Sequence, residues 1–287
     1  MTLEDLKRVQ EIDTELLFMI DDICQKYHIE YYLFYGTLLG CIRHEGPIPW
    51  DDDVDIAMTR ENYKQFLNVV YNEIDGSRYV VKLMGSGSAD YVTEIKIGKL
   101  NTTYCMPGTE NIDIMNHVQL DIFCLDYAKK MSKKQWNLKI KLWKLLRLTG
   151  LNGSEKKLLQ MMIEQSASHF KWVYKCGLSF LHLMRALVGE KNIERIGYHL
   201  FVDEKKKSNM FAVAGEASIW PKNLFSVETK KYAGRYLSVP TGYDEILRIE
   251  YGEYMVFPPK EERYRKHFDK IVFKEEIIKD GMSEFAI

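Results

Sequence analysis

The chain has 287 residues, of which 46% are hydrophobic and 13% aromatic, so it is long and apolar enough for one large globular domain or two smaller ones. Its 40 Lys and Arg residues nearly balance 41 Asp and Glu residues, and the net charge of −1 gives the whole molecule no electrostatic preference for nucleic acid or membrane. Residues 129–191, however, hold 14 basic and 3 acidic residues, a net charge of +11 that leaves −12 for the rest of the chain.

Cysteine usage and the N-terminus indicate a reducing compartment. The five cysteines are odd in number, widely spaced and without a CxxC pair, which argues against a disulfide framework and a structural zinc site. The N-terminal segment carries acidic residues where a signal peptide needs a basic start, and no apolar run approaches the roughly 18 residues of a membrane span. We therefore expect a cytoplasmic protein that does not bind nucleic acid.

Apolar periodicity predicts alternating helices and strands up to residue 127. Thr2 and Asp5 resemble a capping box at the start of an amphipathic helix, because apolar residues follow them at helical spacing. In chain order we predict a helix over 3–27, a buried strand over 31–35, a helical turn over 38–43, a strand over 54–58, a helix over 60–75 and strands over 79–84, 91–97 and 118–124.

The chain changes character after residue 127. A lysine-rich helical pattern extends to about residue 148, a Gly-Leu-Asn-Gly-Ser break follows, and a second helical stretch continues to about residue 190. Short strand-like pieces return after residue 208, with a helix over 244–251. We therefore divide the chain into a catalytic core (1–127), a basic helical subdomain (128–207) and a C-terminal part that completes the core (208–287).

The most unusual segment is GTLLGCIRHEGPIPWDDDVDI, residues 36–56, which places Asp51, Asp52, Asp53 and Asp55 within five positions. Carboxylates this close repel one another and raise each other's pKa, so they are either solvated or neutralised by a cation. Side chains repeat every two residues along a strand, which puts Asp53 and Asp55 on one face. Asp121 is a lone acid in the otherwise apolar strand 118–124, where a carboxylate needs a partner.

Carboxylate oxygens on neighbouring strands suit Mg²⁺ or Mn²⁺. A calcium-binding loop does not fit, because Ile56 stands where that loop needs Gly and Asn62 where it needs Glu. A solvated acidic loop is the plainer alternative. Paired metal ions held by carboxylates serve in-line displacement at phosphorus, so the cluster predicts a phosphate substrate, and Gly36-Thr37 lies upstream at a strand-to-helix turn that can hold phosphate oxygens.

Three segments carry a family resemblance: GTLLGCIRHEGPIPWDDDVDIAM from residue 36, QLDIFCLD at 119–126, and YGEYMVFPPKEER at 251–263. Together they resemble the motifs of the LicD family, over about residues 28 to 265. The resemblance implies an α+β fold, with a polymerase-β-like nucleotidyltransferase core of mixed sheet flanked by helices and an inserted basic helical subdomain.

The resemblance also implies an activity. LicD-type enzymes transfer a substituted phosphate, such as phosphocholine, from a CDP-linked donor to a hydroxyl of a bacterial surface glycan, and CMP leaves. The acceptor would be a teichoic acid, capsule or lipopolysaccharide precursor, often carried on a polyprenyl lipid. Tyr232-Ala233-Gly234 departs from the family's Phe-Glu-Gly, which bears on a choline donor if that Glu holds the donor cation.

We expect the catalytic carboxylates to hold Mg²⁺ or Mn²⁺, as two ions, with Asp121 as a further ligand or as the base for the acceptor hydroxyl. A structural ion pair is the alternative for these acids. The predicted catalytic and metal-binding residues are Asp53, Asp55 and Asp121, and the predicted donor- or phosphate-binding residues are Gly36, Thr37, Arg43, His44, Trp50 and Lys96. Ordinary turns, surface ion pairs or core packing are the plainer roles for the second group.

Lysines alternate with apolar residues such as Trp136, Ile140 and Trp143 over residues 129–147. This pattern is typical of a helix on an anionic membrane, or of a solvated face over an ordinary core, and predicts peripheral contact with the inner face of the plasma membrane. Two other functions remain open. One is nucleotidyl transfer to a protein, RNA or small molecule with pyrophosphate release, and the other is a non-catalytic nucleotide- or glycan-binding module.

Overall fold

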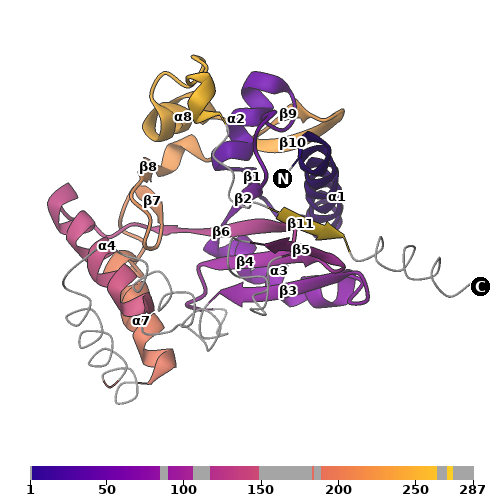
Figure 1. Cartoon of the computed structure of the whole chain (residues 1–287). Helices are drawn as coiled ribbons and strands as arrows, with labels where there is room; N and C mark the ends of the chain where they lie inside the picture. The colour runs from indigo at the N-terminus through magenta and orange to yellow at the C-terminus, as the bar shows by residue number, and fades with distance from the viewer. Residues whose placement is uncertain are drawn as a thin grey trace, which may run out of the picture.

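A curled mixed sheet with helices packed around it forms the body of the molecule in a computed structural model (Figure 1). The structure describes residues 2–84, 90–105, 117–148, 183, 189–263 and 270–273. The predicted combination of helices with a mixed sheet is confirmed. The second helical stretch predicted before residue 190 lies almost entirely outside the described residues, and the predicted division into three parts stays a prediction.

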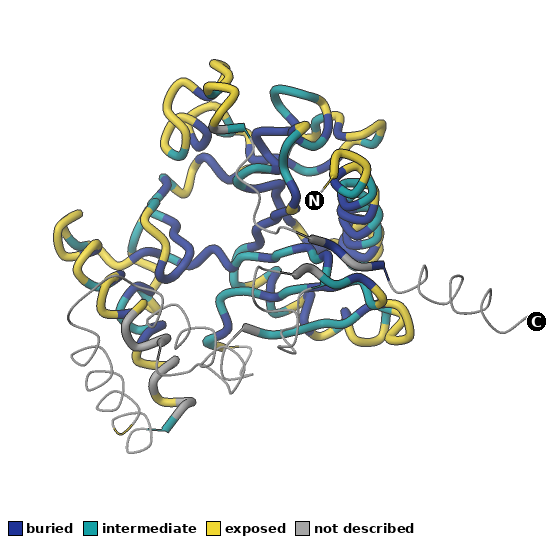
Figure 2. Tube along the Cα trace, in the orientation of Figure 1, coloured by how far each residue is buried: buried dark blue, intermediate teal, exposed yellow. Residues whose placement is uncertain are grey.

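The first helix, α1 (Leu3–Tyr27), has the predicted start and length. The Thr2 side chain accepts the N–H of Asp5 while the Asp5 carboxylate accepts the N–H of Thr2, so the predicted capping box is confirmed. The helix ends at His28, whose left-handed conformation turns its N–H back to the last carbonyl groups. Its apolar face packs on the sheet, against strands β2, β4 and β6, and Figure 2 shows this inner side buried.

The central sheet has the strand order β1-β2-β6-β4-β3, and β7 and β8 extend it beyond the far half of β6. Its strands are β1 (Tyr32–Leu33), β2 (Val54–Thr59), β3 (Tyr79–Met84), β4 (Glu94–Lys99), β6 (Gln119–Tyr127), β7 (Met210–Val213) and β8 (Ile219–Pro221). β2 and β6 run parallel and the other pairs run antiparallel. Helix α3 (Arg60–Glu73) supplies the crossover after β2 and packs on both parallel strands.

The strand predicted over 31–35 is shorter than expected. Only Tyr32 and Leu33 pair with β2, because the backbone at Tyr35 takes a positive φ of 39° and starts helix α2 (Tyr35–His44). The predicted turn over 38–43 is therefore the middle of a ten-residue helix. As a result, Gly36 and Thr37 lie in the first turn of α2 and not in a loop before it.

Two small sheets and a short helix complete the fold. The strands β9 (Val227–Tyr232) and β10 (Arg235–Pro240) form a hairpin, and β5 (Thr102–Cys105) pairs with β11 (Lys270–Phe273). The two-residue turn of the hairpin has φ angles of 47° at Ala233 and 90° at Gly234. Helix α8 (Tyr243–Tyr251) lies against α2 at the top of Figure 1.

A second core lies where α4 (Lys133–Leu148) packs on α7 (Glu190–Phe201). Trp136, Ile140 and Trp143 are buried in it, each no more than 9% exposed. Gly197 lets α7 approach closely, since a Cβ there would lie 1.8 Å from the Trp143 ring. The prediction that these apolar residues form a membrane-facing surface is therefore wrong, because they fill the α4–α7 interface.

Within the described ranges, no helix combines the length and apolar character needed to cross a membrane.

Candidate functional site

The parallel pairing of β2 with β6 brings two predicted carboxylates together. Asp55 lies directly opposite Asp121 in the register, although 65 residues separate them in the chain. β2 is buried along most of its length, because its apolar residues fill both faces of the sheet, and Asp55 is only 8% exposed. Asp53 is exposed and lies just before β2. The structure thus pairs Asp55 with Asp121 and places Asp53 close enough for its charge to act on both.

These carboxylates raise one another's pKa. Burial raises the pKa of Asp55 well above its ordinary value, and the negative charges of Asp53, Asp121 and Asp51 raise it further. Burial also raises the pKa of Asp121, to about 7, although the nearby Lys96 lowers it in part. The folded protein therefore favours the protonated form of Asp55 and Asp121 over a wider pH range than the free side chains have.

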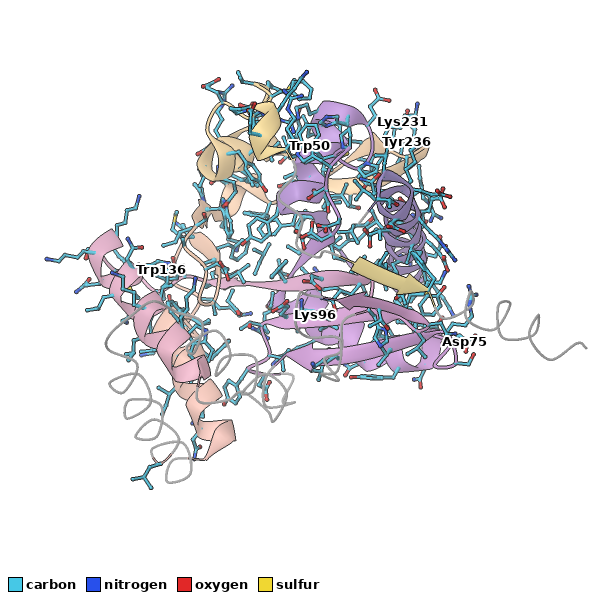
Figure 3. The ribbon with its side chains drawn as sticks, viewed as in Figure 1. Trp50, Asp75, Lys96, Trp136, Lys231 and Tyr236 are labelled. Carbon is cyan, nitrogen blue, oxygen red and sulfur yellow. The ribbon has the colours of Figure 1, made fainter. Side chains whose placement is uncertain are left out.

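Lys96, which the sequence predicted as a phosphate-binding residue, lies within the acid cluster. The antiparallel pairing of β4 with β6 sets Lys96 opposite Asp121. Its Nζ is 2.5 Å from Oδ2 of Asp121 and 2.7 Å from Oε1 of Glu94, and Figure 3 shows it at the centre of the sheet. Burial lowers the pKa of Lys96, but the two carboxylates outweigh this effect and raise it overall. Glu94 is a site residue that the sequence analysis missed.

The start of α2 holds the acidic segment in place. The Thr37 hydroxyl is buried and accepts the backbone N–H of Asp55, at 2.7 Å. A Cβ on Gly36 would lie 2.7 Å from Oδ2 of Asp51, so a larger residue there would displace that carboxylate. Both residues therefore lie in the site as predicted and position its acids, while their role as phosphate contacts stays a prediction.

Arg43, His44 and Trp50 gather at the other end of α2, together with Phe257. The His44 ring packs edge-on against the rings of Trp50 and Phe257, with centroids 6.0 and 5.6 Å away. Burial lowers the pKa of His44, and the charge of Arg43 lowers it further, so the imidazole is neutral at neutral pH. Figure 3 shows Trp50 beside α2, above the sheet.

Two guanidinium groups share these aromatic faces. The Cζ of Arg43 lies 4.9 Å from the Phe257 centroid and 6.0 Å from that of Trp50, and its Nη1 donates to the carbonyl of Tyr254. Arg263 lies 5.3 Å from both rings. Burial lowers the pKa of Arg43, and Arg263 lowers it further while Asp51 opposes that change. This concentration of positive charge lies beside the acidic segment.

Asp13 is a further acid of the site that the sequence analysis missed. It lies on α1, is 4% exposed, and neither of its carboxyl oxygens has a hydrogen-bond partner. Burial raises its pKa well above the ordinary value, followed by the charges of Asp53, Asp52, Asp51 and Asp121. A signal was present, because Asp13 falls four residues after Val9 and four before Leu17, on the apolar face of α1.

The donor set fits a hard divalent cation. Oxygens come from carboxylates on different elements, and Oδ1 of Asp121 is buried without a hydrogen-bond partner. Within the described residues, however, no three His, Cys, Asp or Glu side chains are already gathered closely enough to hold a metal ion. Two Mg²⁺ or Mn²⁺ ions at Asp53, Asp55 and Asp121 therefore stay a prediction.

Comparison with known proteins finds a matching family model and similar proteins. Residues 28–141 match the family model described as LicD/FKTN/FKRP, nucleotidyltransferase domain, so the predicted resemblance to the LicD family is confirmed. Over 285 residues the chain is 27% identical to lipopolysaccharide cholinephosphotransferase LicD of Haemophilus influenzae, an alignment that covers 92% of this chain and 97% of that protein. A 49-residue segment, 17% of this chain and 16% of the relative, is 41% identical to an uncharacterised protein of Rickettsia typhi.

Proposed function

We propose that this protein is a metal-dependent phosphotransferase that moves phosphocholine, or a related substituted phosphate, from a CDP-linked donor to a hydroxyl of a bacterial surface glycan. The observation that carries the proposal is the opposed pair Asp55 and Asp121 on parallel strands, beside Asp53, within a LicD-family domain. The similarity to a lipopolysaccharide cholinephosphotransferase over nearly the whole chain supports the same class of reaction. The central sheet would then be the core of a polymerase-β-like nucleotidyltransferase fold.

In this reaction the bond between phosphorus and the CMP oxygen breaks, a bond from the acceptor oxygen to phosphorus forms, and the hydroxyl proton must go to a base. Asp121 suits that role, since its pKa of about 7 and its unpartnered Oδ1 leave it able to take a proton. Lys96 holds the other oxygen of Asp121 and thereby fixes the orientation of the carboxylate.

Asp53 and Asp55 would hold Mg²⁺ or Mn²⁺, with Asp121 as a further ligand where it does not act as the base, and the metal when bound neutralises charge on the phosphate oxygens. Lys96 would also attract the phosphate. On the donor side, Arg43 and His44 lie with Trp50 in the aromatic cluster, where the guanidinium charges suit a diphosphate and the ring faces suit a quaternary ammonium group. Gly36 and Thr37 would place the first turn of α2 close to the same phosphates.

A donor panel tests this proposal. The protein would be incubated with Mg²⁺ and CDP-choline, CDP-ribitol, CDP-glycerol, ATP or CTP, with a glycan acceptor, and the products separated by chromatography. We expect CMP release from a CDP-linked donor and stabilisation of the protein by that donor in a thermal shift assay. Pyrophosphate release from ATP or CTP, with no CMP from any CDP-linked donor, would instead establish a nucleotidyltransferase.

The acceptor would be a precursor of lipopolysaccharide, capsule or teichoic acid carried on a polyprenyl lipid, which requires contact with a membrane surface. Within residues 129–147, the exposed face of α4 still presents Leu138 and Leu142, 68% and 45% exposed, among exposed lysines. We expect the protein to sediment with anionic vesicles at low salt, and the variant Leu138→Glu/Leu142→Glu to remain in the supernatant. No sedimentation of the unaltered protein would remove this part of the proposal.

A further inference from the structure

Helix α1 carries two buried acids whose surroundings differ. Asp21 is 2% exposed and its oxygens accept hydrogen bonds from the Tyr31 hydroxyl and the Gln25 amide, while Arg235 lies 3.3 Å away. This carboxylate is paired and neutralised as a structural acid should be. Asp13, two turns earlier on the same helix, is 4% exposed and receives no hydrogen bond at either oxygen.

The charges around Asp13 make the ionised form of its buried carboxyl still less favourable. The charged groups that act on it most strongly are Asp53, Asp52, Asp51 and Asp121, all of them negative. Tyr232, on the neighbouring hairpin, is buried and also feels the charges of Asp13 and Asp51. A buried carboxyl that has no hydrogen-bond partner, and on which the strongest charges are negative, is strongly unfavourable in its ionised form unless a cation is bound in front of it.

Both features point to the same kind of ligand. The unpartnered oxygens of Asp13 and the unpartnered Oδ1 of Asp121 belong to one electrostatic group, and carboxylate oxygens are the preferred ligands of hard divalent cations. The helix that carries Asp13 is fixed by contacts with β2, β4 and β6, so the acid is held rigidly beside the strands that bear Asp55 and Asp121.

We propose that Asp13 is a further carboxylate of the divalent-cation site, supplied by α1 to the group formed by Asp53, Asp55 and Asp121. This inference rests on the metal-dependent function proposed above. It adds a fourth element to the site, since the other acids come from β2, β6 and the segment just before β2. It also gives α1 a role in cation binding in addition to covering the sheet.

Cation binding by purified, EDTA-treated protein tests the inference without measuring activity. The variants would be Asp13→Asn and, as the matched control, Asp21→Asn on the same helix. Mn²⁺ affinity would be measured by electron paramagnetic resonance of the free ion, and thermal unfolding would be followed with and without Mg²⁺. We expect Asp13→Asn to unfold at a higher temperature than the unaltered protein without metal, to lose most of the Mg²⁺-induced stabilisation, and to bind Mn²⁺ at least about tenfold more weakly.

The control should behave in the opposite way. Asp21→Asn should unfold at a lower temperature with and without Mg²⁺ and keep its Mn²⁺ affinity, because it loses structural hydrogen bonds only. If Asp13→Asn does not fold, Asp13→Leu, which suits the apolar face of α1, must show the same loss of Mn²⁺ affinity. Unchanged affinity in the Asp13 variant would overturn the inference alone, whereas no Mn²⁺ binding by the unaltered protein would overturn the metal-dependent function as well.

Discussion

Replacing Asp121 with Asn in metal-free buffer tests the electrostatic description of the site. The folded protein raises the pKa of Asp121 from 3.8 to about 7, so the folded state keeps the proton over a pH range in which the unfolded chain has lost it. The stabilising effect of the raised pKa is complete below about pH 4 and disappears as the pH rises to about 7. Asn cannot ionise, so the variant is free of this pH-dependent loss.

The size of the effect follows from the shift. Each pKa unit is worth about 1.4 kcal/mol, and about 2.5 units lie between pH 4.5 and the folded pKa. As the pH rises from about 4.5 to about 8, the free energy of unfolding of Asp121→Asn should therefore increase by about 3 kcal/mol relative to that of the unaltered protein. The opposing attraction of Lys96 is already contained in the folded pKa.

Urea denaturation at the two pH values, with EDTA present, gives both free energies of unfolding. Asp90→Asn is the matched control, because Asp90 is exposed, its hydrogen bond with Lys64 lowers its pKa, and its ionisation therefore favours folding. That control should show no gain at the higher pH. Parallel pH profiles for Asp121→Asn and the unaltered protein would show that the folded state does not raise the pKa of Asp121.

Three further substitutions test how the site and the fold are held. Gly36→Ala places a methyl group 2.7 Å from Oδ2 of Asp51 and should reduce CMP release about tenfold or more while the circular dichroism spectrum is kept. Arg60→Met leaves Asp126, which is 3% exposed, without its ion-pair partner, and should lower the free energy of unfolding in urea by about 3 to 5 kcal/mol. The double variant Arg60→Met/Asp126→Leu should recover most of that loss. Ala233→Gly relieves a φ of 47° and should raise the free energy of unfolding by about 0.5 kcal/mol, whereas a loss of stability would show that the turn is unstrained.

Local signals in the sequence predicted many of the elements correctly. The capping box at Thr2 fixed the start of α1, and apolar alternation placed β2 and β6 within a few residues of their observed bounds. Strand parity predicted that Asp53 and Asp55 act together, because the two-residue repeat is a property of the strand itself. It could not predict that Asp55 faces Asp121, since register depends on which strands pair in the fold.

The missed features depend on long-range packing. Trp143 alternates with lysines in the sequence, but it is buried because Gly197, far along the chain, opens a groove on α7 that no local periodicity reveals. Asp13 was visible as a lone acid on an apolar helix face, and only the packing of α1 on the sheet shows that it lies beside the acidic segment. Glu94 was missed because its ion pair with Lys96 depends on side-chain geometry in the folded sheet.

The proposed Mg²⁺-dependent phosphotransfer requires the carboxylate of Asp55. Its most direct test is CMP release from CDP-choline and a glycan acceptor by the unaltered protein, by Asp55→Asn and by Asp75→Asn, which changes an exposed turn away from Lys96 and Trp50 (Figure 3). We expect Mg²⁺-dependent release by the unaltered protein and by Asp75→Asn, and a loss of about a thousandfold or more in Asp55→Asn. Equal CMP release by Asp55→Asn and the unaltered protein would show that phosphotransfer does not depend on the Asp55 carboxylate.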